Sequence, residues 1–171
     1  FVGNEPFGVI LGDDIVVSKE PALKQLFDTY DKHNKTVVGV QHVPFEDVNK
    51  YGIITPGKTD GKTIQVSSMV EKPEISKAPS NIAIMGRYVL SPSVFTAIEK
   101  QKEGVGGEIQ LTDAIASLIK SEGVMAYEFE GKRYDVGNKL GYLTATCEFA
   151  LNDPKLKEGF KEYLKELVKT F

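Results

Sequence analysis

The first part of the chain alternates between strand-like and helix-like patterns of apolar residues. An apolar run at 7–12 lies between polar or glycine-rich segments and predicts a buried strand. After Pro21, apolar side chains recur at helical spacing, at Leu23, Leu26, Phe27 and Tyr30. Residues 36–42 are rich in β-branched side chains and predict a second strand. This order predicts a βαβ unit, with two parallel strands joined by a right-handed crossover.

The remainder of the chain continues to alternate between the two patterns. Further strands are predicted at 51–55, 63–70, 82–90 and 124–130, and helices after Pro92, around 111–119, over 140–151 and from Pro154 onwards. Asp60-Gly61 predicts a hairpin turn between two of these strands. The last helix is expected to bury an apolar face and to expose ion pairs such as Glu162–Lys165. The fold predicted is α/β, with a Rossmann-like mixed, mostly parallel sheet and flanking helices.

Composition narrows the classes of protein. The chain has 171 residues, 41% of them hydrophobic, with 21 Lys and Arg against 24 Asp and Glu, which is typical of a globular domain with its own core. The nearly balanced charge argues against a nucleic-acid partner. The longest uncharged stretch, 88–98, is shorter than the ~20 residues of a membrane span, so no membrane partner is expected. The single Cys147 excludes an internal disulfide, and His33 and His42 alone make no metal cluster.

Acidic residues follow one strand and end another. Asp13-Asp14 comes directly after the strand at 7–12, and Asp135 lies between a strand and a helix. Carboxylates at the carboxyl ends of strands suit Mg²⁺, which proteins bind with one or two carboxylates and the phosphates of a substrate. The alternative is that these residues form turns or cap helices.

A charged pair ends the strand at 63–70. Glu71 is suited to accept hydrogen bonds from sugar hydroxyls, and Lys72 to bind phosphate. Pro73 is expected to keep Lys72 extended. Because neighbours in a strand point to opposite faces, both side chains can meet one ligand only if the strand bends there. Gly52 would allow close approach of a ligand or mark a bulge, and residues 104–108 would offer backbone amides or form a plain loop.

Seven blocks of sequence run in a fixed order along almost the whole chain. They are LGDD (11–14), YGII (51–54), VEKP (70–73), APSN (78–81), GRYV (86–89), GEIQLTDAI (107–115) and GKRYDVGNKLG (131–141). In this order the blocks closely resemble the bacterial UTP–glucose-1-phosphate uridylyltransferases, a branch of the sugar-phosphate nucleotidyltransferases. The block at 108–115 and the block at 134–141 are typical of that branch, whereas Glu-Lys-Pro is shared more widely.

The resemblance implies a reaction and a set of site residues. UTP and α-D-glucose 1-phosphate would give UDP-glucose and pyrophosphate with Mg²⁺, in a self-associating cytoplasmic enzyme. Asp13 and Asp135 would hold the metal, Lys72 the sugar phosphate and Glu71 a glucose hydroxyl, so that Asp13, Lys72 and Asp135 are the expected catalytic residues. Gly52 would lie beside the sugar, and the resemblance also places Asn81 and Glu108 in the wall of the site.

One family feature is not found in these residues. The Gly-rich loop that binds the nucleotide triphosphate is missing, and the sequence begins with Phe1. We therefore expect residues 1–171 to be a partial domain, the C-terminal portion of a family member, with the sugar-phosphate and metal side and the C-terminal helices. Because the missing part selects the base, a thymidylyl- or cytidylyltransferase and a non-catalytic fragment that binds sugar phosphate stay open.

Overall fold

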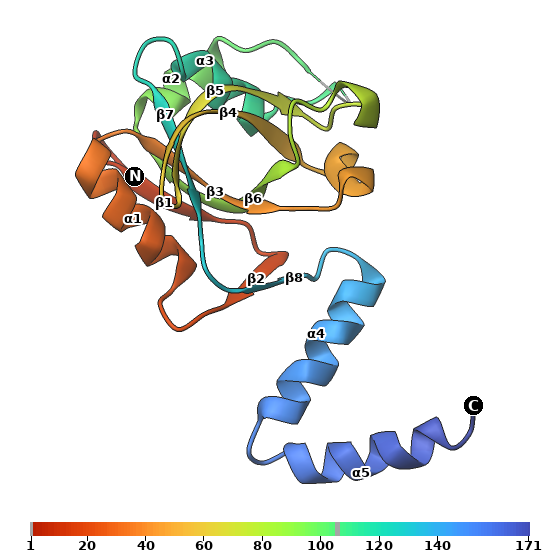
Figure 1. Cartoon of the computed structure of the whole chain (residues 1–171). Helices are drawn as coiled ribbons and strands as arrows, with labels where there is room; N and C mark the ends of the chain where they lie inside the picture. Colours follow the sequence, from red (N-terminus) through yellow and green to blue (C-terminus); the bar gives the residue numbers. More distant parts are fainter. Residues whose placement is uncertain (1, 105–106) are drawn as a thin grey trace. The chain divides into compact units, whose positions relative to one another are not determined.

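The computed structural model describes residues 2–104 and 107–171 and divides the chain into two compact units. Unit 1 comprises residues 2–11 and 18–131, and unit 2 comprises Gly12–Val17 and Lys132–Phe171, within these described ranges. Figure 1 labels the helices and strands of both units.

Unit 1 contains a mixed sheet with helices. Its strands are β1 (Phe7–Ile10), β3 (Thr36–His42), β4 (Gly52–Asp60), β5 (Thr63–Glu71), β6 (Ile82–Leu90) and β7 (Val124–Glu128). Its helices are α1 (Ala22–His33), α2 (Ser93–Glu99), α3 (Leu111–Leu118) and the short 3₁₀ turns η1 (Phe45–Lys50) and η2 (Ile75–Lys77). The predicted strands at 36–42 and 82–90 are confirmed with the same bounds.

The sheet has the strand order β1-β6-β3-β7-β5-β4. Among the strand pairings of the described residues, β3–β7 is parallel and the others are antiparallel. A mixed sheet with flanking helices is therefore confirmed, and the prediction that it is mostly parallel is wrong. The reason lies in β6, which inserts between β1 and β3 and runs against both, so the predicted parallel strands share a direction without being neighbours.

Strand β6 also closes the sheet on itself. One of its edges pairs with β3, while the other pairs with β1 between Arg87 and Leu90 and with β4 at Ala83. Gly86 separates these two stretches and has a φ of +41°, a conformation that glycine adopts without strain. The pairings of β6, β3, β7, β5 and β4 thus form a closed ring.

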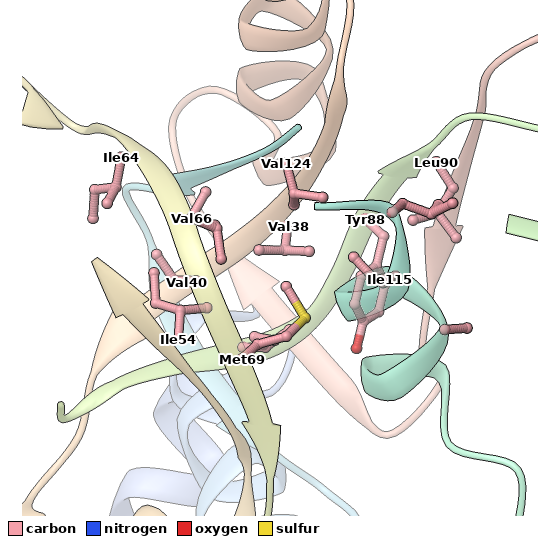
Figure 2. Packing of buried hydrophobic residues seen from close by; sticks show 14 of the residues in the cluster. Val38, Val40, Ile54, Ile64, Val66, Met69, Tyr88, Leu90, Ile115 and Val124 are labelled. Atoms are coloured by element: carbon pink, nitrogen blue, oxygen red, sulfur yellow. The ribbon is translucent and has the colours of Figure 1, made fainter. Parts of the chain in front are cut away.

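The interior of unit 1 is filled by aliphatic side chains. Figure 2 shows Val38 and Val40 of β3, Ile54 of β4, Val66 of β5 and Ile115 of α3 in one cluster. Each of these five side chains is at most 2% exposed. Burying such side chains stabilises a fold by about 1.5–3 kcal/mol each. The core therefore fixes α3 against β5, the strand that ends at Glu71.

Unit 2 is an antiparallel ladder followed by two helices. The strands β2 (Asp14–Val17) and β8 (Lys132–Asp135) pair with Asp14 opposite Asp135, and the helices are α4 (Lys139–Asn152) and α5 (Lys157–Val168). The Asn138 side chain caps α4 by accepting a hydrogen bond from the Gly141 amide at 2.7 Å. Sequence patterns did not predict β2, because its residues follow the apolar run at 7–12 too closely.

The helices of unit 2 bury little of their surface. None of the described residues of α5 is buried, so the prediction of a buried apolar face is wrong, whereas the expected Glu162–Lys165 ion pair is present at 2.8 Å. Cys147 on α4 is half-buried and free. Within the described ranges, the structure contains no helix of sufficient length and apolarity to cross a membrane.

Candidate functional site

Glu71 and Gly52 face each other at the ends of two paired strands in unit 1. Gly52 begins β4, Glu71 ends β5, and the ladder pairs them directly. The Glu71 side chain is only 11% exposed, and the Thr112 hydroxyl donates a hydrogen bond to its Oε2 atom at 2.5 Å. Thr112 lies in the first turn of α3 and is itself buried. Helix α3 therefore holds the carboxylate that the resemblance assigns to the sugar.

The chain bends sharply at Lys72. Its φ is +44°, so the prediction that Pro73 keeps Lys72 extended is wrong. The Lys72 amide donates a hydrogen bond to the Tyr51 carbonyl at 3.0 Å, and this bond accompanies a conformation that costs a residue with a Cβ atom about 1–2 kcal/mol. The bend brings Lys72 Nζ to 3.9 Å from Glu71 Oε1. The strand thus has the bend that Glu71 and Lys72 need if their side chains are to meet one ligand.

Gly52 makes room for the group around Glu71. A Cβ atom at this position would lie 2.9 Å from Thr112 Oγ1 and 3.0 Å from Glu71 Oε2. These distances are too short for any other residue unless the hydroxyl or the carboxylate moves. The glycine therefore admits the Glu71–Thr112 pair, while its position beside the sugar stays a prediction. Gly52, Glu71, Lys72 and Thr112 are called the Glu71 group below.

The other two predicted wall residues of unit 1 have their own surroundings. The Asn81 amide donates to the Val43 carbonyl at 2.9 Å, and its Oδ1 atom lies 3.0 Å from His42 Nδ1. These bonds tie the start of β6 to the end of β3. Glu108 is exposed. In the loop at 104–108, residues 105 and 106 lie outside the described part of the chain. Roles in binding for Asn81 and Glu108 stay predictions.

In unit 2, the carboxylates of Asp13 and Asp135 converge. The Val136 amide donates to the Asp13 carbonyl at 2.8 Å, which continues the ladder to this point. A Cβ atom on Gly137 would lie 3.0 Å from Asp13 Oδ2 and 3.2 Å from Asp135 Oδ1. The Gly137 amide donates to Asp135 Oδ1 at 3.1 Å. The structure thus brings together the two aspartates predicted to bind a metal, over a glycine; we call them the aspartate pair.

The neighbouring Asp14 has a different environment from that of Asp13. Asp14 is buried and accepts a hydrogen bond from Arg133 Nε, whereas Asp13 is exposed. The other end of the Arg133 guanidinium lies 3.8 Å from Asp135 Oδ2. Arg133 and Asp135 are two residues apart on β8 and so share a face. That spacing could have pointed to Arg133, which the sequence reasoning missed, as it missed Thr112.

The chemistry of the aspartate pair fits a hard divalent cation. Mg²⁺ prefers oxygen ligands and commonly takes one or two carboxylates, with water and substrate phosphates in its other positions. Within residues 2–104 and 107–171, no group of three or more His, Cys, Asp or Glu side chains could hold a metal. The pair by itself therefore suits a cation that is shared with phosphates rather than enclosed by protein.

Comparison with known proteins places the chain in a class. A family model described as nucleotidyl transferase matches residues 1–151, and the chain belongs to this family. The resemblance seen in the sequence is thereby confirmed at the level of the family.

Particular relatives share much of this sequence. The chain is 53% identical over 167 residues to a UTP–glucose-1-phosphate uridylyltransferase of Staphylococcus epidermidis and 51% identical over 168 residues to that of Bacillus subtilis. In both comparisons the match covers 98% of this chain but only 58% of the relative, so the chain spans less than two thirds of the curated relatives' length.

Solved structures agree with this grouping. A UDP-glucose pyrophosphorylase complexed with UDP-glucose matches with a TM-score of 0.86 and 40% identity, over 89% of this chain and 58% of that one. A UTP-bound UGPase from Acinetobacter baumannii matches with a TM-score of 0.85 and 36% identity, over 97% of this chain and 58% of that one.

Proposed function

We propose that the protein carrying this sequence transfers the uridylyl group of UTP to α-D-glucose 1-phosphate, giving UDP-glucose and pyrophosphate. The observation that carries the proposal is the aspartate pair over Gly137, which offers two carboxylate oxygens and leaves further positions of a cation to phosphates. The names of the relatives support the choice of substrates. Self-association, a cytoplasmic location and the assignment of residues 1–171 to one partial domain stay predictions.

The residues of the chain would divide the work by their chemistry. A phosphate oxygen of the sugar phosphate attacks the α-phosphorus of UTP in line, and the bond from that phosphorus to the leaving pyrophosphate breaks. Asp13 and Asp135 would hold Mg²⁺, which when bound neutralises charge that develops on phosphate oxygens. Lys72 would bind the sugar phosphate, and Glu71 would accept a hydrogen bond from a glucose hydroxyl. Positioning and charge stabilisation supply most of the rate in such transfers.

Turnover by the intact protein that carries this sequence tests the proposal. Pyrophosphate release from glucose 1-phosphate is measured with UTP, dTTP and CTP, and we expect UTP to give the highest kcat/KM. Asp13→Asn and Lys72→Ala should each lower kcat/KM well over tenfold, which corresponds to about 2–4 kcal/mol of transition-state stabilisation.

Matched controls lie on the exposed side of α1. Asp28→Asn and Lys24→Ala change the same residue types in a surface ion pair and should leave kcat/KM unchanged. A preference for dTTP or CTP would contradict the uridylyl assignment. If none of the three nucleotides supports turnover, the proposal that the protein is an enzyme is contradicted. If turnover is unchanged in both Asp13→Asn and Lys72→Ala, the assignment of these residues is wrong.

A further inference from the structure

We infer that Thr112 is a positioning residue that, with Gly52, holds the Glu71 carboxylate in one orientation and thereby sets selectivity for the sugar. The inference rests on the proposed function, in which Glu71 accepts a hydrogen bond from a sugar hydroxyl. It concerns residues of unit 1 that belong to three different elements, β4, β5 and α3.

The hydrogen bond between Thr112 and Glu71 has a defined direction. An ionised carboxylate only accepts hydrogen bonds, so the Thr112 hydroxyl donates its single proton to Oε2, at 2.5 Å. The second oxygen, Oε1, is 3.9 Å from Lys72 Nζ. The bond is charge-assisted and lies where both residues are largely buried, which makes it stronger than a neutral bond at the surface. Oε1 is therefore the oxygen left for a ligand.

The donor is fixed by its surroundings. Thr112 is β-branched, so its side chain has few rotamers, and it lies in the first turn of a helix. The next turn of that helix is anchored in the core by Ala114 and Ile115, both of which are 0% exposed. The hydroxyl therefore does not follow Glu71 if the carboxylate rotates.

Gly52 closes the other side of the carboxylate. The position of a Cβ at residue 52 is within 3.0 Å of both Glu71 Oε2 and Thr112 Oγ1, so any larger residue would displace one of the two. The glycine and the threonine thus act on the same carboxylate oxygen. A carboxylate held in this way accepts a hydrogen bond from a hydroxyl at one position, and a sugar whose hydroxyl points elsewhere leaves it unpaired.

Calorimetric binding of three small ligands to the intact protein tests the inference. The ligands are α-D-glucose 1-phosphate, its epimer α-D-galactose 1-phosphate and inorganic phosphate. Thr112→Val removes the donor and keeps the shape, and we expect it to weaken glucose 1-phosphate binding about tenfold, to reduce the preference over the epimer and to leave the Kd for phosphate unchanged. Thr112→Ser restores the donor and should return the Kd for glucose 1-phosphate to within about twofold of the original.

Further variants separate this inference from the proposed function. Ser117→Ala removes a hydroxyl from the same helix, one that donates to the Ala114 carbonyl within that helix, and should change none of the three Kd values. If Glu71→Gln weakens glucose 1-phosphate binding while Thr112→Val does not, the positioning role is wrong and the proposed function stands. If Glu71→Gln has no effect, the positioning role of Thr112 and the assignment of Glu71 to a glucose hydroxyl are both overturned, whereas the transfer reaction itself is judged by the turnover measurement. Equal losses for glucose 1-phosphate and phosphate in Thr112→Val would also overturn the positioning role.

Discussion

The Glu71 group and the aspartate pair are held in place by different forces. The Glu71 group lies at the ends of strands that close around an aliphatic core, and Thr112 reaches it from a helix whose Ile115 is fully buried. The aspartate pair lies beside a ladder of two short strands. In the described part of unit 2, only Asp14, Tyr134 and Ala145 are buried.

This difference changes what each group depends on. An isolated pair of strands is at best marginally stable in water, so unit 2 needs other interactions. The structure supplies polar ones: Arg133 pairs with Asp14, and Glu148 on α4 accepts hydrogen bonds from Lys132 and Tyr134 of β8. Apolar burial does not depend on pH, whereas such polar interactions depend on the charge state of each partner. The comparison predicts that the two units respond to different perturbations.

The largest effect on stability is expected from the core of unit 1. Ile115→Ala removes a fully buried side chain and should lower the free energy of opening of β3 and β6 by about 3 kcal/mol, as measured by native-state hydrogen exchange. Leu143→Ala is the matched change in unit 2, where Leu143 is 58% exposed, and should cost less than about 0.5 kcal/mol. Equal losses would show that apolar burial supports both units alike.

A smaller effect is expected from the buried ion pair of unit 2. Arg133→Gln leaves Asp14 without the guanidinium and should lower the free energy of opening of β2 and β8 by about 2 kcal/mol. This is less than the loss typical of a fully buried ion pair, because both side chains keep some exposure. Amide exchange in these strands is the measurement. Arg133→Gln with Asp14→Asn should recover part of the loss, because the buried Asp14 carboxylate is then removed together with the guanidinium that pairs with it.

The neighbouring residue provides the control for that change. Lys132 precedes Arg133 on the same strand, and its side chain is 59% exposed, so Lys132→Gln should cost clearly less than Arg133→Gln. A cost as large as that of Arg133→Gln would mean that exposed and buried pairs contribute equally, and the explanation of unit 2 by its buried pair would be wrong.

Much of the fold could be predicted from local patterns, and the errors have a common cause. The strands at 36–42 and 82–90 follow from unbroken runs of apolar and β-branched residues. The direction of each strand in the sheet depends on which strands become neighbours, and no local pattern contains the insertion of β6 between β1 and β3. The buried face predicted for α5 failed for a related reason, because helical spacing identifies an apolar face but not what covers it.

The candidate site shows the same division between local and distant information. Asp13, Asp135, Glu71 and Lys72 stand out in short motifs, and the structure brings each pair together. Thr112 was missed because its partner is 41 residues away in the sequence. A bend at Lys72 was expected if Glu71 and Lys72 were to meet one ligand, whereas the following proline favoured an extended Lys72. The preference before proline is an average one, and a hydrogen bond from the Lys72 amide to Tyr51 can outweigh it.

The smallest expected effect is a dependence of unit 2 on pH through Glu148. Hydrogen bonds from Lys132, then from Tyr134, lower the pKa of Glu148 below its ordinary value of 4.5. The bond with Glu148 likewise raises the pKa of Lys132 above 10.5. Because the pKa of the Glu148 carboxyl is lowered in the folded state, its contribution to stability is fully present above pH 4.5. That contribution is lost as the pH falls through the lowered pKa. The raised lysine pKa contributes below 10.5 and is lost in stronger alkali.

Thermal unfolding of the wild type and of Glu148→Gln across this range measures the effect. We expect the wild type to have the higher Tm at pH 7 and the difference to vanish as the pH falls below 4.5 and through the lowered pKa of Glu148, where the folded carboxyl gains its proton. Glu162→Gln changes an exposed pair on α5, in which Glu162 is 66% and Lys165 56% exposed, and should leave Tm unchanged at every pH. If the difference in Tm between wild type and Glu148→Gln is constant with pH, Glu148 supports α4 by its shape and not by its charge. The conclusion that ionic interactions stabilise unit 2 would then be wrong for this residue.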